Sequence, residues 1–174
     1  MINGDFLEEL KIFDFSNILN GGGAFDYSKI IKILEKLTIE KIGKLITLKQ
    51  LKDEFDKILI CCTYNLSKRE REYVSYKNYP ELNCIDALQM SSSIPFIFGR
   101  CKYQDSYYID GGIMDNFPIQ IVDNNKNNVI GILLINKGKK EKIDSEFKFF
   151  EHFYNILLIM VNENNIEKCK SVSH

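Results

Sequence analysis

The sequence has few of the residues that build metal centres. It contains two histidines and five cysteines in 174 residues, and no two cysteines form a C-x-x-C pair. A Cys/His metal site needs about four such ligands at short spacings, so this composition argues against one. The paired Cys61 and Cys62 stand inside an apolar run and are expected to pack as small hydrophobic residues. We therefore expect no metal and no cofactor.

The sequence also lacks the signals of secretion, membrane insertion and nucleic-acid binding. The N-terminal stretch MINGDFLEELKIF has no basic region, unlike a signal peptide. The apolar run ILLIMV near the C-terminus is far too short to cross a membrane. The net charge of -1, with lysines interleaved among acidic residues, gives no electrostatic reason to bind nucleic acid. We expect a soluble, cytoplasmic protein.

What the sequence does contain is a globular composition with clear local signals. It is 45% hydrophobic, with 12 Phe and 9 Tyr, and its length suits one domain. Apolar spacing and capping residues predict helices at 28–42, from the Thr47/Gln50 capping box to Phe55, at 83–95 between the N-cap Asn83 and Pro95, from Pro118 to Val122, and at 145–168.

Strands are expected between these helices. They are predicted at 57–66, 71–78, as two short strands within 100–110 that join at Asp105-Ser106, and at 129–136. The runs at 57–66 and 129–136 are apolar on both faces, which is typical of strands covered on both sides. The alternation predicts an α/β layered sheet with helices on both faces. Residues 1–144 would form the domain, and 145–174 a C-terminal helix packed on it or following it.

The stretch YYIDGGIMDNFPI, residues 107–119, holds the strongest candidate for chemistry. Asp110 ends a strand-like run, and Gly111 and Gly112 follow at once. Glycines there could adopt backbone angles closed to other residues, and they place no side chain against a substrate or a neighbouring backbone. A carboxylate held by the strand behind it could serve as a base for a nucleophile on an adjacent loop. Taken alone, Asp-Gly-Gly is more often the signature of a tight turn.

The surroundings of this motif resemble the patatin-like phospholipase family. A helix ends in the small residues and proline of SSSIP, an apolar patch and a hairpin follow, and then come Asp-Gly-Gly and the Asn-x-Pro of Asn116 and Pro118. The upstream order of loop, helix, capped helix, two strands and helix also resembles the order of elements in that family. The resemblance covers roughly residues 20–136, and its combination of motifs is specific.

The resemblance implies acyl-ester hydrolysis by a Ser–Asp dyad without a histidine, on a lipid or acyl-ester substrate. It assigns Asp110 as the proton acceptor. Gly111, Gly112, Asn116 and Pro118 would support the motif. The residues that would line the site are Ser91, Ser92, Ser93 and Pro95.

The sequence departs from the family at the nucleophile. The family's serine lies in G-x-S-x-G, and no two glycines here are four positions apart. NGGGAF, residues 20–25, lacks the basic residue of the family's oxyanion loop, so we interpret it as a plain loop. The serines of SSSIP have no elbow glycines and are expected to pack and cap, with a substitute nucleophile there a minor alternative. Asp115 and Asn116 together with Asp110 offer too few ligands for a hard cation.

Three explanations for the missing nucleophile stay open. The chain could be a piece of a longer reading frame, a split enzyme whose N-terminal half is encoded separately, or a degenerate relative. The first two make it the Asp-bearing, C-terminal part of a lipid acyl hydrolase, incomplete at its N-terminal side. The third makes it an inactive module, peripheral at membrane surfaces, or an interaction fragment with an open sheet edge. In each case we expect the chain alone to be inactive, because the two dyad residues act as one unit.

Overall fold

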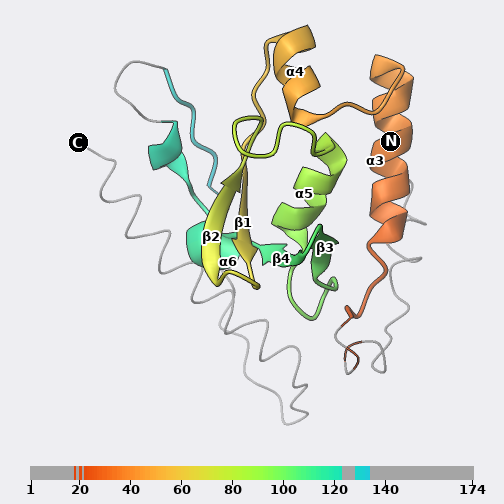
Figure 1. Cartoon of the computed structure of the whole chain (residues 1–174), viewed down its shortest axis with the longest axis vertical. Helices are drawn as coiled ribbons and strands as arrows, with labels where there is room; N and C mark the ends of the chain where they lie inside the picture. The colour runs from red at the N-terminus through yellow and green to blue at the C-terminus, as the bar shows by residue number, and fades with distance from the viewer. Residues whose placement is uncertain (1–17, 19, 21, 123–127, 134–174) are drawn as a thin grey trace. The chain divides into compact units, whose positions relative to one another are not determined.

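The computed structural model describes residues 18, 20, 22–122 and 128–133 (Figure 1). The chain divides into two compact units, one that ends at Gly111 and one that begins at Gly112, and each is described by itself. The helix expected at 145–168 and the boundary expected between 144 and 145 lie outside the described residues and stay predictions.

The first unit contains the three predicted helices α3 (Ser28–Ile42), α4 (Leu48–Phe55) and α5 (Cys84–Ser92). The predicted capping box of α4 is present, because the Thr47 hydroxyl accepts the Gln50 N–H and the Gln50 side chain accepts the Thr47 N–H. The Asn83 side chain accepts the Ile85 N–H at 2.9 Å and caps α5, as predicted. Local capping chemistry therefore fixes where both short helices begin.

The same unit contains a four-stranded sheet in the order β2-β1-β4-β3. Its strands are β1 (Cys61–Asn65), β2 (Glu70–Val74), β3 (Cys101–Tyr103) and β4 (Ser106–Asp110), and every pairing is antiparallel. β3 and β4 form the predicted hairpin, in which Tyr103 faces Ser106. Helices and a sheet together confirm the predicted α/β class.

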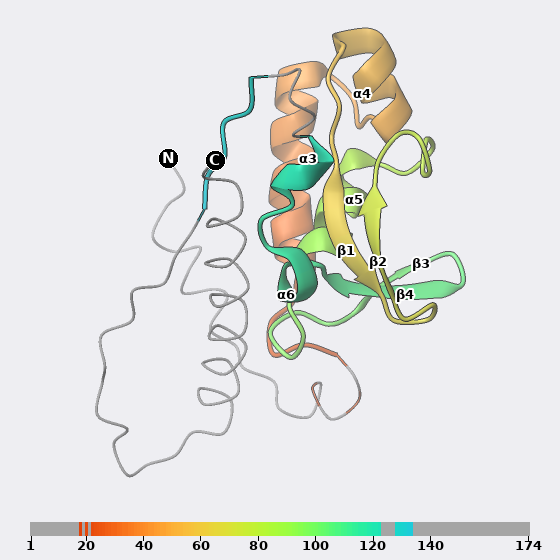
Figure 2. The same cartoon turned by 90° about the vertical axis from the view of Figure 1, so that its left-hand side faces the viewer.

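The core of the first unit lies where α5 packs against β1 and β4. In Figure 1 and Figure 2, α5 lies between the strands and α3, which it contacts on its other side. Ala87 and Met90 of α5 are fully buried. Along β1 the buried residues are Cys61, Thr63 and Asn65, whereas Cys62 and Tyr64 between them are half-buried. None of the five residues of β1 is exposed, and what covers its second face stays a prediction.

The second unit contributes two short helical segments. α6 spans Gly112–Asp115, and a 3-10 helix, η1, spans Ile119–Ile121 with Pro118 as its N-cap. The helical turn predicted after Pro118 is thus confirmed in place, in the tighter 3-10 form.

The strand predicted at 129–136 is wrong where it can be compared. Residues 129–133 form no strand, and the side chains of Ile130 and Ile132 are 91% and 82% exposed. Apolar residues form a strand only where a neighbouring strand can pair with them. A continuous apolar run does not show whether such a strand exists. Among the described residues no helix is long and apolar enough to cross a membrane.

Candidate active site

Asp110 is held at the end of a strand by backbone contacts on two sides. It is the last residue of β4 and stands opposite Thr63 of β1 in the ladder. Its N–H donates to the Ser93 carbonyl oxygen at 3.0 Å, directly after α5. Asp110 itself is half-buried. The position of its Cα is therefore set by β1, β4 and the end of α5 together.

Gly111 has no side chain because the neighbouring strand leaves no room for one. A Cβ at this position would lie 2.5 Å from the Cys62 carbonyl carbon and from the Thr63 nitrogen. Backbone atoms cannot yield as a flexible side chain would, so any larger residue would push β4 away from β1. Gly111 does not adopt a left-handed φ. Of the two reasons the sequence suggested for glycine, close approach is right here, and unusual backbone angles are wrong.

Thr63 links the three elements that meet behind Asp110. Its side chain is fully buried, and its hydroxyl lies 3.0 Å from the Met90 carbonyl oxygen and 2.9 Å from the Ile109 carbonyl oxygen. As a donor between two carbonyls, it satisfies polar groups of α5 and β4 inside the core. Thr63 is not among the residues predicted from the sequence. The only available signal was a hydroxyl in the middle of an apolar strand.

The three candidate serines donate to carbonyl groups of the helix that carries them. The hydroxyls of Ser91 and Ser92 reach the Leu88 carbonyl oxygen at 3.1 and 2.6 Å, and that of Ser93 reaches Gln89 at 2.7 Å. These bonds satisfy carbonyls near the end of α5, in keeping with the packing and capping interpretation. A role for these serines and Pro95 in lining a substrate site stays a prediction.

The glycine loop is docked onto the segment that follows α5. The N–H groups of Ala24 and Phe25 donate to the carbonyls of Phe96 and Ile97 at 2.8 and 2.9 Å. A Cβ on Gly23 would lie 2.3 Å from the Gly99 nitrogen, so this contact also requires a glycine. The plain-loop interpretation missed this docking.

Beside this loop, Tyr27 reaches both α5 and the segment that follows it. The Tyr27 ring packs edge-on to Phe98 with centroids 4.8 Å apart, and the Tyr27 hydroxyl contacts the Ser92 hydroxyl. The segment leading into α3 is therefore tied to the end of α5 that holds Asp110.

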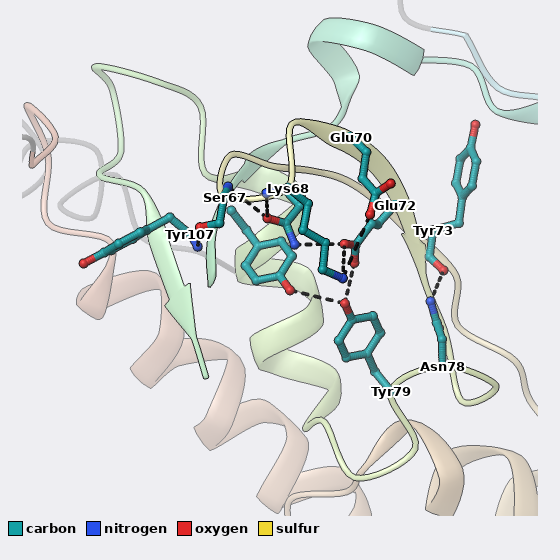
Figure 3. A network of polar contacts seen from close by, with 10 residues as sticks. Ser67, Lys68, Glu70, Glu72, Tyr73, Asn78, Tyr79 and Tyr107 are labelled. Atoms are coloured by element: carbon teal, nitrogen blue, oxygen red, sulfur yellow. Dashed lines mark hydrogen bonds and ion pairs between the residues drawn. The ribbon is translucent and has the colours of Figure 1, made fainter. Parts of the chain in front are cut away.

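A polar network connects three strands of the sheet (Figure 3). The Glu72 carboxylate of β2 accepts hydrogen bonds from Asn65 at 2.8 Å, from Lys68 at 3.1 Å and from the Tyr79 hydroxyl. Asn65 is fully buried, and its side-chain oxygen accepts two N–H groups of the following turn. The Tyr79 hydroxyl also lies 3.2 Å from that of Tyr108 on β4. The network therefore connects β1, β2 and β4.

This network has a clear electrostatic consequence. Burial raises the pKa of Glu72, but the hydrogen bonds from Tyr79, Lys68 and Asn65 outweigh it and hold that pKa below its ordinary value. Burial and the Glu72 carboxylate together raise the pKa of Tyr79. Both groups have hydrogen-bond partners within the protein, so we assign them a role in stability.

The remaining motif residues belong to the second unit. Asp115 is buried, Asn116 is exposed and Pro118 caps η1. Their supporting role, like that of Gly112, stays a prediction. Within the described part of the chain, no group of three or more His, Cys, Asp or Glu residues could hold a metal ion.

Known proteins similar in sequence to this chain identify its family. The sequence model of the patatin-like phospholipase family matches residues 4–123, a range that includes Asp110 and its supporting elements. The chain is 34% identical over 153 residues to a protein of Invertebrate iridescent virus 6 named a probable lipid hydrolase, covering 83% of this chain and 51% of that protein. It is 25% identical over 178 residues to an uncharacterized protein of Acanthamoeba polyphaga mimivirus, covering 98% of this chain and 58% of that protein.

The chain therefore spans between half and three fifths of the length of these two relatives. The match nevertheless covers most of the present sequence and the three elements that meet at Asp110. The chain belongs to the patatin-like phospholipase family.

Proposed function

We propose that this chain carries the catalytic base of a lipid acyl hydrolase, and that Asp110 is that base. The observation that supports this most is the way Asp110 is held, between the Thr63 position of β1 and the Ser93 carbonyl at the end of α5. A general base must be placed within about 3 Å of the hydroxyl it deprotonates, and a strand end fixed from two sides suits that demand.

In this reaction the Asp110 carboxylate accepts the proton of a serine hydroxyl while the serine oxygen attacks the ester carbonyl. The carbonyl becomes a tetrahedral oxyanion, which backbone N–H groups stabilise. The alcohol leaves with the proton, and water then cleaves the acyl-serine with Asp110 again as the base. The substrate is a lipid or another acyl ester, and neither metal nor cofactor takes part in these steps.

The serine in this proposal comes from a polypeptide segment outside the present sequence. The sequence contains no G-x-S-x-G, and the hydroxyls of Ser91, Ser92 and Ser93 are engaged with helix carbonyls. A separately encoded half, or further sequence of the same polypeptide, would provide the nucleophile. The protein would act in the cytoplasm and reach lipid by contact with a membrane surface.

The test measures release of p-nitrophenol from p-nitrophenyl butyrate. The chain alone is expected to give no turnover above buffer. Mixed with, or fused behind, the G-x-S-x-G segment of an active patatin-like phospholipase, it should hydrolyse the ester, and Asp110→Asn should reduce kcat by about 10³-fold or more. Asp105→Asn, an exposed acid in the β3–β4 turn, is the matched control and should leave kcat unchanged.

Three results would reject the proposal. Turnover by the chain alone that survives Asp110→Asn would assign the activity to another group. Absence of turnover in the complemented protein, together with binding of the chain to phosphatidylcholine vesicles in a co-sedimentation assay, would favour the alternative of an inactive lipid-surface-binding relative. Binding to neither vesicles nor ester would leave the interaction fragment as the better description.

A further inference from the structure

The peptide group between Ile109 and Asp110 is held at both of its polar ends from outside its own strand. At one end, the Ile109 carbonyl oxygen lies 2.9 Å from the Thr63 hydroxyl. At the other end, the Asp110 N–H donates to the Ser93 carbonyl oxygen at 3.0 Å. A trans peptide group is planar, and its plane includes the Cα atoms on both sides. Holding its oxygen and its N–H therefore fixes the plane and places the Cα atom of Asp110.

Thr63 also restricts the chain on the other side of Asp110. The next residue, Gly111, packs so closely on β1 that a Cβ there would lie 2.5 Å from the Thr63 nitrogen. Once its Cα atom is placed, the direction of the Asp110 side chain depends first on the two backbone angles of that residue. Contacts before and after Asp110 limit both angles. We call the contacts of Thr63 and Ser93 with residues 109–111 the Asp110 clamp.

The clamp depends on a hydroxyl group with one proton and two acceptors. The second acceptor is the Met90 carbonyl oxygen, 3.0 Å away, in the last turn of α5, where carbonyls have no N–H partner in their own helix. The Thr63 side chain is fully buried. A valine has nearly the same shape and would fit the same space, but it would leave both carbonyls without this donor. The hydroxyl therefore ties the end of α5 to the peptide group that precedes the candidate base.

We propose, resting on the function proposed above, that Thr63 is a positioning residue for Asp110 and that its hydroxyl sets the direction of the Asp110 carboxylate. Thr63 acts through Asp110 and takes no part in the chemistry itself. A displacement of about 1 Å is enough to slow proton transfer from a nucleophile to its base. Loss of the hydroxyl therefore lowers kcat and leaves KM unchanged, because the carboxylate acts on the serine proton and not on the bound ester.

The first measurement uses the chain by itself and follows amide hydrogen exchange by NMR. Thr63→Val should speed exchange of the Asp110 amide at least about tenfold more than exchange in the β1–β2 ladder, because the change opens only the clamp. Thr63→Ser keeps the hydroxyl and should exchange like the wild type. The matched control is Ser75→Ala, which removes another buried hydroxyl of the same unit, 3.2 Å from the Asn78 side-chain oxygen. It should not single out the Asp110 amide.

The second measurement uses the same variants in the complemented protein with p-nitrophenyl butyrate. Thr63→Val should reduce kcat about tenfold with KM unchanged. Thr63→Ser should restore kcat to within about threefold of the wild type. Ser75→Ala should leave both constants unchanged. Circular dichroism at the assay temperature gives the folded fraction of each variant, so that a loss of folded protein is not counted as a loss of kcat.

The outcomes separate the clamp from the proposed function. Faster exchange confined to Asp110, together with the lower kcat, supports the clamp. Equal acceleration of the Asp110 and ladder amides overturns it, and so does an unchanged kcat in an active complemented protein. If the complemented wild-type protein is inactive, the function proposed above is rejected, while the exchange data still support or overturn the clamp.

A second variant decides the question if Thr63→Val does not fold. Thr63→Ser removes the methyl group and keeps the hydroxyl. Wild-type exchange of the Asp110 amide in this variant supports the hydroxyl as the group that holds Asp110. Faster exchange of that amide, with the ladder amides unchanged, assigns the role to the methyl group and overturns the clamp.

Discussion

The helices α5 and α3 differ in how deeply they are buried, and their sequences do not predict this difference. α5 has nine residues, three of which (Ile85, Ala87 and Met90) are buried, whereas none of the fifteen residues of α3 is buried in the described structure. Yet α3 has the longer apolar periodicity. Periodicity therefore predicts that a helix forms and which face is apolar, but the extent of burial depends on what lies against that face.

The cause of the difference is the number of elements that each helix contacts. α5 packs on β1, β4 and α3, and its carbonyl groups accept from Thr63 and, just past its end, from Asp110. α3 packs on α5 and leaves Leu37 and Ile39 about half exposed, at 52% and 48%. The candidate base is thus attached to the most constrained part of the unit, which is the part expected to hold a catalytic geometry.

The largest expected contrast comes from truncating one side chain in each helix. Met90→Ala should lower the free energy of unfolding by about 3 kcal/mol, because a fully buried side chain leaves a cavity. Leu37→Ala should change it by less than about 0.5 kcal/mol, because Leu37 is 52% exposed. Urea denaturation measures both. Equal losses would mean that α3 is as deeply packed as α5, and the comparison would be wrong.

A smaller contrast is expected between two glycines that are needed for different reasons. Gly111→Ala should cost about 2 kcal/mol, because the new Cβ meets the backbone of Cys62 and Thr63 at 2.5 Å. Gly43→Ala, at the end of α3, should cost about 1 kcal/mol. There the space is open, and the cost arises from its left-handed φ of 86°. Thermal unfolding of both variants measures the difference. A tolerated Gly111→Ala would show that β4 can move away from β1.

Local signals predicted most of the secondary structure. Thr47 with Gln50 and Asn83 with Pro95 marked helix ends, because a cap involves residues adjacent in sequence. The α3 bounds followed from apolar spacing and are confirmed at 28–42. The position of Asp110 at the end of a strand could be predicted for the same reason. Its aromatic run and its glycines are neighbours in the chain.

What could not be predicted depends on partners far apart in sequence. The register that sets Thr63 opposite Asp110, and the Ser93 carbonyl that accepts from Asp110, are contacts across the fold that no local pattern encodes. The exposed run at 129–133 shows the same limit, because its apolar residues predicted a strand without identifying a neighbour. The reason for Gly111 was likewise visible only once β1 lay beside it.

The smallest expected contrast compares two glutamates as a function of pH. The folded pKa of Glu72 lies below its ordinary value, so the unfolded chain binds the proton more tightly. The stability from Glu72 is therefore present above the unfolded pKa and is lost as the pH falls through the folded pKa.

Glu72→Gln should cost about 1 kcal/mol at pH 7 and flatten the stability profile at acid pH. Glu40→Gln on α3, where an exposed pair with Lys36 spans 3.8 Å, should leave the profile unchanged. Urea midpoints between about pH 3 and 7 measure both, a range set by ordinary Glu titration. A wild-type acid slope that survives Glu72→Gln would assign the pH dependence to other carboxylates, and the polar network of β1, β2 and β4 would then contribute no more than the surface of α3.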